Sequence, residues 1–433
     1  MFPILEPNNT NLQEGRTYSL HLSSGRFLPV RWSRAPLREA LDAILIDRPN
    51  RLDILSRLKE YPHLFALLDE HCLFYAKQRK AQVREWLSQG VYIFGAYKIG
   101  VKIARHALLS GCSLKGFIDN DQGKDGQIVE GISISHPSVL DLNGEVVIVA
   151  SGRHGNAIQQ QLREIADVRI VNMHEFLYAL EAPQGPESDF TSFVHSPHQE
   201  AFRFISAFLR LDDERSRQVF DGLIGMRTGL SINLADDIKS PFDEEYFDCS
   251  FVSSEQAARF VDAGAFTGDT LRRLEQRFGP VKQAYLFEPE LPAYYEALKS
   301  FSERQNVWLF NMGLDESPSR AVYQPTLSCD MTHEIEGPVA PGTTSYIQGV
   351  PLDEVLRGRV GLFKLDIEGM EARALRGARA TIVRDRPVLA VCAYHRADDY
   401  WRLIDEVQAI RPDYRIAIRL YADILEDITL YFY

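Results

Sequence analysis

Residues 260–270 read FVDAGAFTGDT, an apolar strand that runs through two glycines into a helix. Gly264 and Gly268 flank a turn at the carboxyl end of the strand, where glycine lets the backbone come close to a bound molecule. Asp269 or Thr270 begins the helix TLRRLEQRF. Taken alone, the pattern predicts either a ligand-binding turn or an ordinary tight turn between a strand and a capped helix.

Two carboxylates at strand ends favour the ligand-binding interpretation. Asp262 ends the first strand, where it can accept hydrogen bonds from a cationic part of a ligand. Glu288 ends the next strand in YLFEPE, 26 positions after Asp262, and Pro289 fixes the turn behind it. An acid at the end of the second strand of a nucleotide-binding sheet binds ribose hydroxyls. The alternative for Glu288 is a carboxylate that only faces solvent.

The apolar runs around these motifs predict a parallel sheet with a hairpin at one edge. The runs are RFVDAG (259–264), QAYLFEP (283–289), VWLFNMG (307–313), GLFKLD (361–366), PVLAVCAY (387–394), YRIAIRLYA (414–422) and DITLYFY (427–433). Helical segments separate most of them, and such runs are typical of strands buried on both faces. The last two are joined only by DILE, which predicts the hairpin.

This half of the chain resembles the FkbM-type S-adenosylmethionine-dependent methyltransferases. The matching motifs are VDAGAFTGDT, LFEPE, LFNMGL, PLDEV, FKLDIEGMEARALRGA and VCAYHRADDYWRLID with the terminal LYFY, within roughly Asp212 to Tyr433. The resemblance implies a seven-strand sheet with a reversed terminal hairpin and S-adenosyl-L-methionine as the cofactor. It also implies methyl transfer, with an oxygen of a sugar or related polyhydroxylated metabolite as the expected acceptor.

The resemblance assigns cofactor contacts to residues of the two strand ends. They are Asp262, Gly264, Gly268, Asp269, Thr270 and Glu288. It implies that Asp262 and the two glycines line the methionine end of the cofactor, and that Glu288 binds its ribose. Where the family often has Asn, this chain has Phe266, so no side-chain contact is carried over at that position.

Methyl transfer to a hydroxyl requires an aligned acceptor and a group that takes its proton. The ends of the fourth and fifth strands supply Asp366 and Glu368 in KLDIEGME and His395 in AYHRADD. His395 titrates near neutrality and is the predicted base, with Asp366 orienting the acceptor or the imidazole. Lys364 lies two residues before Asp366, on the same side of the strand, and is expected to hold that carboxylate ionised.

Other roles for these residues are open. Asp366 and Glu368 would have only a structural role if they tie down the turn at Gly369. His395 would have no catalytic role if it is simply a half-exposed residue at the end of a strand. A third interpretation has Asp366, Glu368 and His395 binding a divalent metal. The sequence does not show that the three converge, so no metal is predicted.

The whole chain divides into four predicted segments within an α/β fold class of two Rossmann-like domains. We expect a helical N-terminal segment over 1–90 and a small Rossmann-like module over 91–182. A linker with a helical lead-in follows over 183–250, because residues 181–199 are rich in Pro, Ser and Gly. The S-adenosylmethionine-dependent methyltransferase domain occupies 251–433.

The first module has an incomplete dinucleotide motif. In YIFGAYKIG, Tyr97 stands between Gly95 and Gly100, where a middle glycine would let backbone touch a pyrophosphate. Asp119 in FIDND is spaced correctly for a ribose, and ASGRHGN (150–156) offers polar and basic groups at a later strand end. The module is similar to nucleotide-sugar- or CoA-binding modules, and nucleotide binding and a purely packing role are equally favoured.

Two other functions follow if that module carries the activity. In the first, the protein is an NAD-dependent oxidoreductase or epimerase, against which Tyr97 and the lack of a Tyr-x-x-x-Lys pair argue. In the second, it is a non-catalytic nucleotide-binding protein.

In the second half of the chain, two polar segments are predicted to be lids that select the acceptor. They are 241–251, with Tyr246 and Phe247, and 324–348.

Composition narrows the partners to small molecules. Lys and Arg total 48 against 60 Asp and Glu, a formal charge of -12, which argues against nucleic acid or a membrane surface as partner. The five cysteines lack metal-ligand spacing. The first residues do not read as a secretion signal, and no apolar run approaches the roughly 18 residues of a membrane span, so a cytoplasmic location is expected. The expected partner is a small-molecule acceptor, such as a sugar or nucleotide-sugar.

Overall fold

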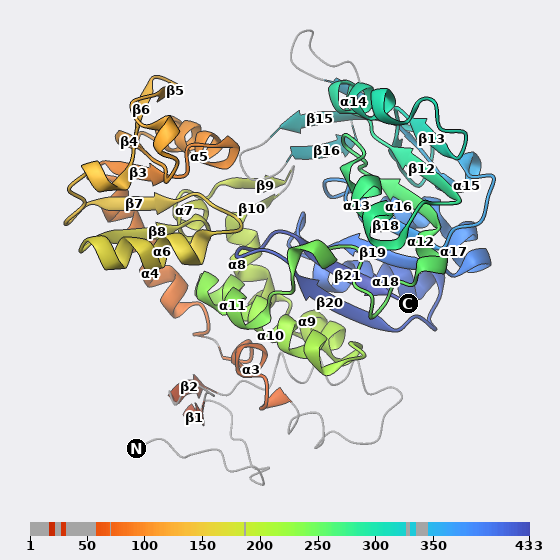
Figure 1. Ribbon diagram of the computed structural model, residues 1–433. Helices are drawn as coiled ribbons and strands as arrows, with labels where there is room; N and C mark the ends of the chain where they lie inside the picture. Colours follow the sequence, from red (N-terminus) through yellow and green to blue (C-terminus); the bar gives the residue numbers. More distant parts are fainter. Residues whose placement is uncertain are drawn as a thin grey trace.

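Two α/β units joined by helices make up the described part of the chain (Figure 1). The computed structural model describes residues 17–21, 27–31, 58–69, 71–185, 188–325, 330–334 and 345–433. The first unit is drawn in orange and yellow and the second in green to blue. This confirms the predicted α/β fold class. None of the helices in these ranges is long and apolar enough to cross a membrane.

The N-terminal segment is only partly helical. Strands β1 (Thr17–His21) and β2 (Phe27–Arg31) form an antiparallel pair, so the expectation of helices throughout 1–90 is wrong here. Within the segment expected to be helical, the stretch LREALDAILI at 37–46 has apolar residues at helical spacing and lies outside the described residues. Helices α3 (Pro62–Ala66) and α4 (Phe74–Leu87) agree with the apolar spacing of that region.

The first α/β unit is built on a six-strand sheet with the order β5-β6-β4-β3-β7-β8. Its strands are β3 (Val91–Phe94), β4 (Leu114–Ile118), β5 (Ile128–Val129), β6 (Ile132–Ser135), β7 (Val146–Val149) and β8 (Arg169–Asn172). All pairs are parallel except β5 with β6. The chain starts at β3, builds outward through β4, and then crosses to β7 on the other side. Its helices are α5 (Lys98–Leu109), α6 (Gly155–Ile165) and α7 (Met173–Ala179).

The segment expected to be a linker is mostly helical. After the short strands β9 (Pro183–Gly185) and β10 (Ser188–Asp189), α8 (Phe190–Gln199) buries Phe190, Phe193 and Val194. Pro197 lies inside this helix, which shows why the Pro and Ser content misled the prediction. Helices α9 (Ala201–Leu209), α10 (Glu214–Gly229) and α11 (Ala235–Ile238) follow, and they agree with the expected helical lead-in. Buried apolar side chains form one continuous cluster from α3 through these helices to both sheets.

The second unit contains the predicted seven-strand sheet, in the order β13-β12-β11-β18-β19-β21-β20. Its strands are β11 (Arg259–Ala263), β12 (Gln283–Phe287), β13 (Val307–Phe310), β18 (Leu362–Leu365), β19 (Val388–Cys392), β20 (Ile416–Leu420) and β21 (Ile428–Phe432). Only β21 runs antiparallel, to both of its neighbours. The reversed terminal hairpin is therefore confirmed.

Helices cover this sheet, and a second small sheet lies beside it. The helices are α12 (Ser254–Ala257), α13 (Asp269–Phe278), α14 (Leu291–Phe301), α15 (Leu352–Val355), α16 (Glu371–Gly377), α17 (Arg379–Asp385) and α18 (Asp399–Ile410). The small sheet has the order β14-β17-β15-β16, with β14 (Gly313–Leu314), β15 (Ser319–Pro325), β16 (Asp330–Glu334) and β17 (Ser345–Val350). The predicted lid at 324–348 thus contains strands, and its residues 326–329 and 335–344 lie outside the described ranges.

Candidate active site

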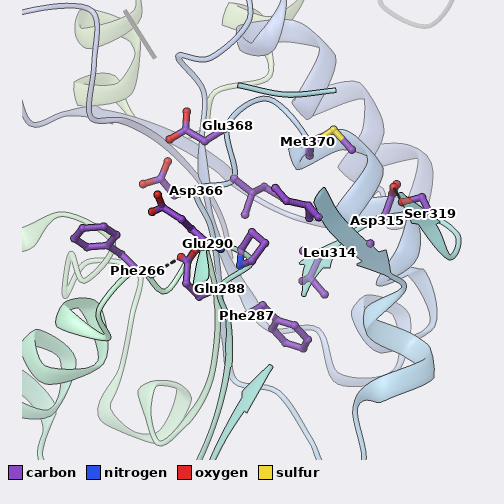
Figure 2. A pocket seen from close by; sticks show the side chains of 16 residues that line it. Phe266, Phe287, Glu288, Glu290, Leu314, Asp315, Ser319, Asp366, Glu368 and Met370 are labelled. Atoms are coloured by element: carbon purple, nitrogen blue, oxygen red, sulfur yellow. Dashed lines mark hydrogen bonds between the residues drawn. The ribbon is translucent and has the colours of Figure 1, made fainter. Parts of the chain in front are cut away.

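A cavity of about 350 Å³ lies at the carboxyl ends of β11, β12 and β18. Five carboxylates line it, and none of its described lining residues is basic: Glu288, Glu290, Asp315, Asp366 and Glu368. Figure 2 shows the carboxyl groups of Glu290, Asp366 and Glu368 gathered at one end, with Asp315 at the other beside Ser319. A site of this composition suits a ligand that carries positive charge and hydroxyl groups.

Glu288 holds the glycine turn and faces the cavity. Its Oε2 accepts the backbone N–H of Phe266 at 2.7 Å, and its Oε1 accepts the N–H of Glu290 at 2.7 Å (Figure 2). A carboxylate has about four acceptor sites, so roughly two remain for a ligand. Burial raises the pKa of Glu288. Its predicted ribose role stays a prediction, to which the structure adds the fixing of the turn.

The two glycines of the turn are required by packing within the protein. Both have φ of +78°, which favours glycine. A Cβ on Gly264 would lie 1.9 Å from the carbonyl oxygen of Asp366, and one on Gly268 would lie 2.3 Å from a ring carbon of Phe301. Gly264 lines the cavity, whereas Gly268 does not.

The start of α13 also lies outside the cavity. Asp269 is the first residue of this helix, as expected, and Thr270 is buried behind it. Neither residue lines the cavity. The structure therefore brings Glu288 and Gly264 together at the cavity, but not the other residues assigned to the cofactor.

Asp262 and Lys364 form a completely buried ion pair beneath the turn. Nζ of Lys364 lies 3.1 Å from Oδ1 of Asp262 and donates to the carbonyl oxygens of Ala263 at 3.2 Å and Gly264 at 2.6 Å. Burial raises the pKa of Asp262 to about 6, although Lys364 opposes the rise. Neither side chain lines the cavity. Their geometry supports the turn rather than contact with cofactor or acceptor.

His395 is enclosed by three carboxylates. Nδ1 lies 3.0 Å from Oε1 of Glu371, and Nε2 lies 3.4 Å from Oδ1 of Asp366 and 3.5 Å from Oε2 of Glu368. Burial alone would lower the pKa of His395, but Glu371, Glu368 and Asp366 raise it well above its ordinary value. The expectation that His395 titrates near neutrality is therefore wrong. A buried imidazolium has no free lone pair with which to act as a base.

Glu371, which the sequence reasoning missed, ties down the turn after β18. Its Oε1 accepts the N–H groups of Ile367 at 2.9 Å and Gly369 at 3.4 Å. Asp366 and Glu368 were the alternative candidates for that structural role, and they face the cavity instead. Glu368 has φ of +58°, a left-handed conformation that is costly for this residue and is often found at functional sites. An acid at the first position of a helix was the only sequence signal for Glu371.

Asp366 is held ionised at the edge of the cavity. It accepts the hydroxyl groups of Tyr246 at 3.0 Å and Tyr394 at 3.1 Å. Burial would raise its pKa, but Lys364 and His395 outweigh this and hold the pKa of Asp366 below its usual value. Lys364 was expected to hold Asp366 ionised, and the lowered pKa of Asp366 agrees with that expectation. Asp366 keeps about a quarter of its side chain exposed, 24%.

The aromatic pair of the predicted lid at 241–251 belongs to the core. Tyr246 and Phe247 are both buried, and Tyr246 reaches Asp366 from within the protein. The aromatic pair therefore supports the site from behind. In this respect the prediction of a surface lid was wrong. The sequence alone does not distinguish a Tyr-Phe pair that faces solvent from one that is buried in the core.

Asp366, Glu368 and His395 do converge, but as an ion-pair cluster. Within the described ranges, no group of three or more His, Cys, Asp and Glu side chains is arranged to hold a metal ion. Each nitrogen of His395 faces a carboxylate, so both nitrogens carry a proton in this cluster. A histidine that binds a metal instead needs an unprotonated nitrogen with a free lone pair.

The raised pKa of His395 predicts a pH-dependent stability. The unfolded pKa is about 6.5 and the folded pKa lies well above it. The stabilisation is therefore complete below about pH 6.5 and is lost as the pH rises through the folded pKa. The difference in free energy of unfolding between wild type and His395→Gln should be largest below about pH 6.5 and shrink as the pH rises through the raised pKa of His395. Urea unfolding across this range measures it, and a constant difference would contradict the ion-pair cluster.

The order of the sheet and the cavity at its carboxyl edge define an α/β domain of the Rossmann-like class. Within that class, residues 262–415 match the family model described as the Methyltransferase FkbM domain. The match falls within the region whose sequence motifs resemble the same family.

Solved structures extend the similarity of fold beyond that domain. Methyltransferase FkbM from Methylobacillus flagellatus KT is 20% identical with a TM-score of 0.65, over 88% of this chain and 100% of that chain. The similarity of fold covers 88% of this chain, which is more than residues 262–415 alone. The shared fold therefore includes part of the N-terminal half. No curated protein matches the chain.

Two further structures are much more distant. Aeropyrum pernix fibrillarin, in complex with natively bound S-adenosyl-L-methionine, is 14% identical over 42% of this chain and 69% of that chain, with a TM-score of 0.28. An rRNA-methylase described for Clostridium thermocellum is 11% identical over 44% and 91%, also at 0.28. TM-scores of 0.28 do not establish a shared fold, so nothing is inferred from these two structures.

Proposed function

We propose that the protein is a methyltransferase that binds S-adenosylmethionine in the 350 Å³ cavity. We further propose that it methylates a hydroxyl oxygen of a sugar or related polyhydroxylated small molecule. The observation that carries the proposal is the acid-lined cavity at the carboxyl edge of the sheet, within a domain that matches the FkbM family. When bound, S-adenosylmethionine supplies an electrophilic methyl group on a positively charged sulfur.

The residues of the cavity fit such a cofactor. Two free acceptor sites on Glu288 match the two hydroxyl groups of a ribose. The positive charges of the sulfonium and amino groups suit a cavity lined by carboxylates without a basic side chain among its described lining. Apolar surface for the rest of the molecule comes from Phe287, Leu314 and Ile347.

We assign the proton acceptor to Asp366 in place of His395. Asp366 is ionised, partly exposed and directed into the cavity, so it can accept the proton of an acceptor hydroxyl. His395 acts as a positioning residue, because its imidazolium lies between Asp366 and Glu368 and favours the charged form of Asp366. Glu368 lies beside Asp366 and can accept a hydrogen bond from a neighbouring hydroxyl, which favours a polyhydroxylated acceptor.

Calorimetric titration with S-adenosylhomocysteine tests the assignment of the cavity. Glu288→Gln should weaken binding by roughly 10- to 150-fold, the loss expected for hydrogen bonds to a charged group worth about 1.5 to 3 kcal/mol. The amide places an N–H donor against one of two backbone N–H donors, so it cannot hold the turn and a ribose together.

The matched control is Glu296→Gln, because Glu296 is an exposed residue of α14 that pairs with Lys299 at the surface. It should bind S-adenosylhomocysteine as the wild type does. Absence of binding by the wild type, or equal affinity of wild type and Glu288→Gln, would contradict the proposal. In parallel, binding of NAD in place of S-adenosylhomocysteine would favour an oxidoreductase.

A further inference from the structure

A second cavity, of about 850 Å³, lies at the carboxyl edge of the first sheet. It is lined by Gly95 after β3, Asp119 after β4 and Ser151 after β7. The chain builds outward from β3 through β4 in one direction and through β7 in the other. The crevice at such a reversal of strand order is where open parallel sheets bind ligands.

The methyltransferase domain supplies one wall of this cavity. The loop between β20 and β21 contributes Glu426 and Asp427, and Figure 1 shows this dark blue loop reaching toward the first unit. The contact is specific, because the N–H of Asp423 donates to the carbonyl oxygen of Gly152 at 2.9 Å. The cavity is therefore completed only when both units are present.

Asp119 is held in the same way as Glu288. Oδ2 of Asp119 accepts the N–H of Ala96, in the turn after the first strand, and Oδ1 accepts the N–H of Asp121, two residues on, each at 3.0 Å. Glu288 likewise accepts an N–H two residues on, that of Glu290, but its partner in the preceding turn is Phe266, one position further along that turn than Ala96. Lys124 occupies a third acceptor site of Asp119 at 2.8 Å, which leaves about one for a ligand hydroxyl.

The turns before the two acids are also alike. Each has the sequence Gly-Ala-aromatic, ending in Tyr97 in the first unit and Phe266 in the second. Both aromatic side chains line their cavities and are largely exposed, 70% for Tyr97 and 51% for Phe266. Tyr97 has φ of -132°, which any residue adopts, so it replaces the middle glycine without strain. Its exposed ring offers a surface on which a nucleobase can stack.

Two groups beside the cavity suit an anion. The guanidinium of Arg153 lies 3.5 Å from the ring centre of Phe242 and 3.7 Å from Asp427, and half of its side chain is exposed. Helix α5 begins without a side-chain cap and without an acid in its first turn. By contrast, Asp423 accepts the N–H of Asn156 in the first turn of α6 at 3.3 Å. The first turn of α5 thus remains for a phosphate.

The acidic wall opposes an anion less than its composition suggests. Burial, together with Asp427, raises the pKa of Glu426 to about 8, so this carboxyl is largely uncharged at neutral pH. Burial also raises the pKa of Asp427. Glu426 in its protonated form can donate a hydrogen bond to a ligand oxygen.

We propose that this cavity is a second ligand site and binds a ribonucleoside diphosphate. In this site Asp119 binds the ribose, Tyr97 stacks on the base, and Arg153 with the first turn of α5 binds the diphosphate. No residue lines both this cavity and the 350 Å³ cavity, so the two proposed sites can be tested separately.

Calorimetric titration of the full chain with ADP, GDP, CDP, UDP and inorganic pyrophosphate tests the proposal. We expect at least one nucleotide to bind once per chain with a Kd below about 100 μM, and pyrophosphate to bind at least roughly tenfold more weakly. Asp119→Asn and Tyr97→Ala should each weaken nucleotide binding by roughly tenfold or more. Tyr97 is exposed, so its variant reports on the site even if Asp119→Asn disturbs folding.

Two controls separate this site from the first. Tyr295→Ala removes an exposed tyrosine of α14 that lines neither cavity, and should bind nucleotide as the wild type does. Glu288→Gln should lose S-adenosylhomocysteine but keep the nucleotide. The proposal is overturned if no nucleotide binds with a Kd below about 100 μM, if pyrophosphate binds within roughly tenfold of the nucleotide, if Tyr97→Ala has no effect, or if Glu288→Gln abolishes nucleotide binding. Nucleotide binding without S-adenosylhomocysteine binding would refute only the proposed methyl transfer.

Discussion

Replacing Lys364 with Met is expected to lower the free energy of unfolding by about 3 to 5 kcal/mol, the loss typical of breaking a buried ion pair. Nζ of Lys364 lies 3.1 Å from Asp262, and both side chains are completely buried. Methionine has a similar length but no charge. It would leave Asp262 in the core without its counter-ion, and the carbonyl oxygens of Ala263 and Gly264 without their donor. Urea unfolding followed by circular dichroism measures the loss.

The same substitution at Lys299 is the matched control. Lys299 pairs with Glu296 on the surface of α14, where ion pairs contribute little, so Lys299→Met should change stability by less than about 1 kcal/mol. The double variant Asp262→Asn with Lys364→Met removes both charges and should recover about 2 kcal/mol of the loss. If Lys364→Met cost no more than Lys299→Met, the buried pair would not support the fold.

This pair also shows why the role of Lys364 was difficult to predict from the sequence. Side chains two residues apart on a strand point the same way, which led the sequence reasoning to pair Lys364 with Asp366. In the sheet, Asp262 of β11 lies directly opposite Lys364 of β18. That register depends on which strands are neighbours, and no local pattern in one sequence records it.

Features with a local signal were predicted well. The seven strands of the second sheet follow from apolar runs with breakers, and the reversed hairpin follows from the four residues of DILE. The helix α8 was missed because Pro and Ser were taken to mark a linker, whereas Phe190 and Val194 bury one face of it. Tertiary packing here outweighs the local preference of these residues.

The candidate site likewise contains residues whose roles were predicted from the sequence and residues whose roles were not. Glu288 was identified because the second strand of this fold ends in an acid at a known spacing, and it does line the cavity. His395 was chosen for its ordinary pKa, which its surroundings change. Glu371 is the decisive partner, 24 residues away in the chain and 3.0 Å away in space. Sequence identifies the titratable groups, but the charges around them determine which can act as a base.

Asp366→Asn is expected to reduce the rate of methyl transfer by roughly 100- to 10,000-fold, the range for loss of a general base. Asparagine has the same shape and can still accept a hydrogen bond from Tyr246 or Tyr394, but it cannot take a proton from an acceptor hydroxyl. Affinity for S-adenosylhomocysteine should stay within a factor of about three, because Glu288 and the glycine turn are unchanged. Transfer of a labelled methyl group to an acceptor found by screening sugars and nucleotide-sugars measures the rate.

The pH dependence of the rate separates Asp366 from His395 as the base. His395 stays protonated well above its ordinary pKa, so the wild-type rate should show no inflection near pH 6.5. The control Asp405→Asn changes an exposed residue of α18 and should transfer methyl groups at the wild-type rate. An inflection near pH 6.5 that disappears in His395→Gln, together with a near-normal rate in Asp366→Asn, would return the role of base to His395. It would also mean that the acceptor, on binding, separates the imidazolium from the carboxylates that hold its proton.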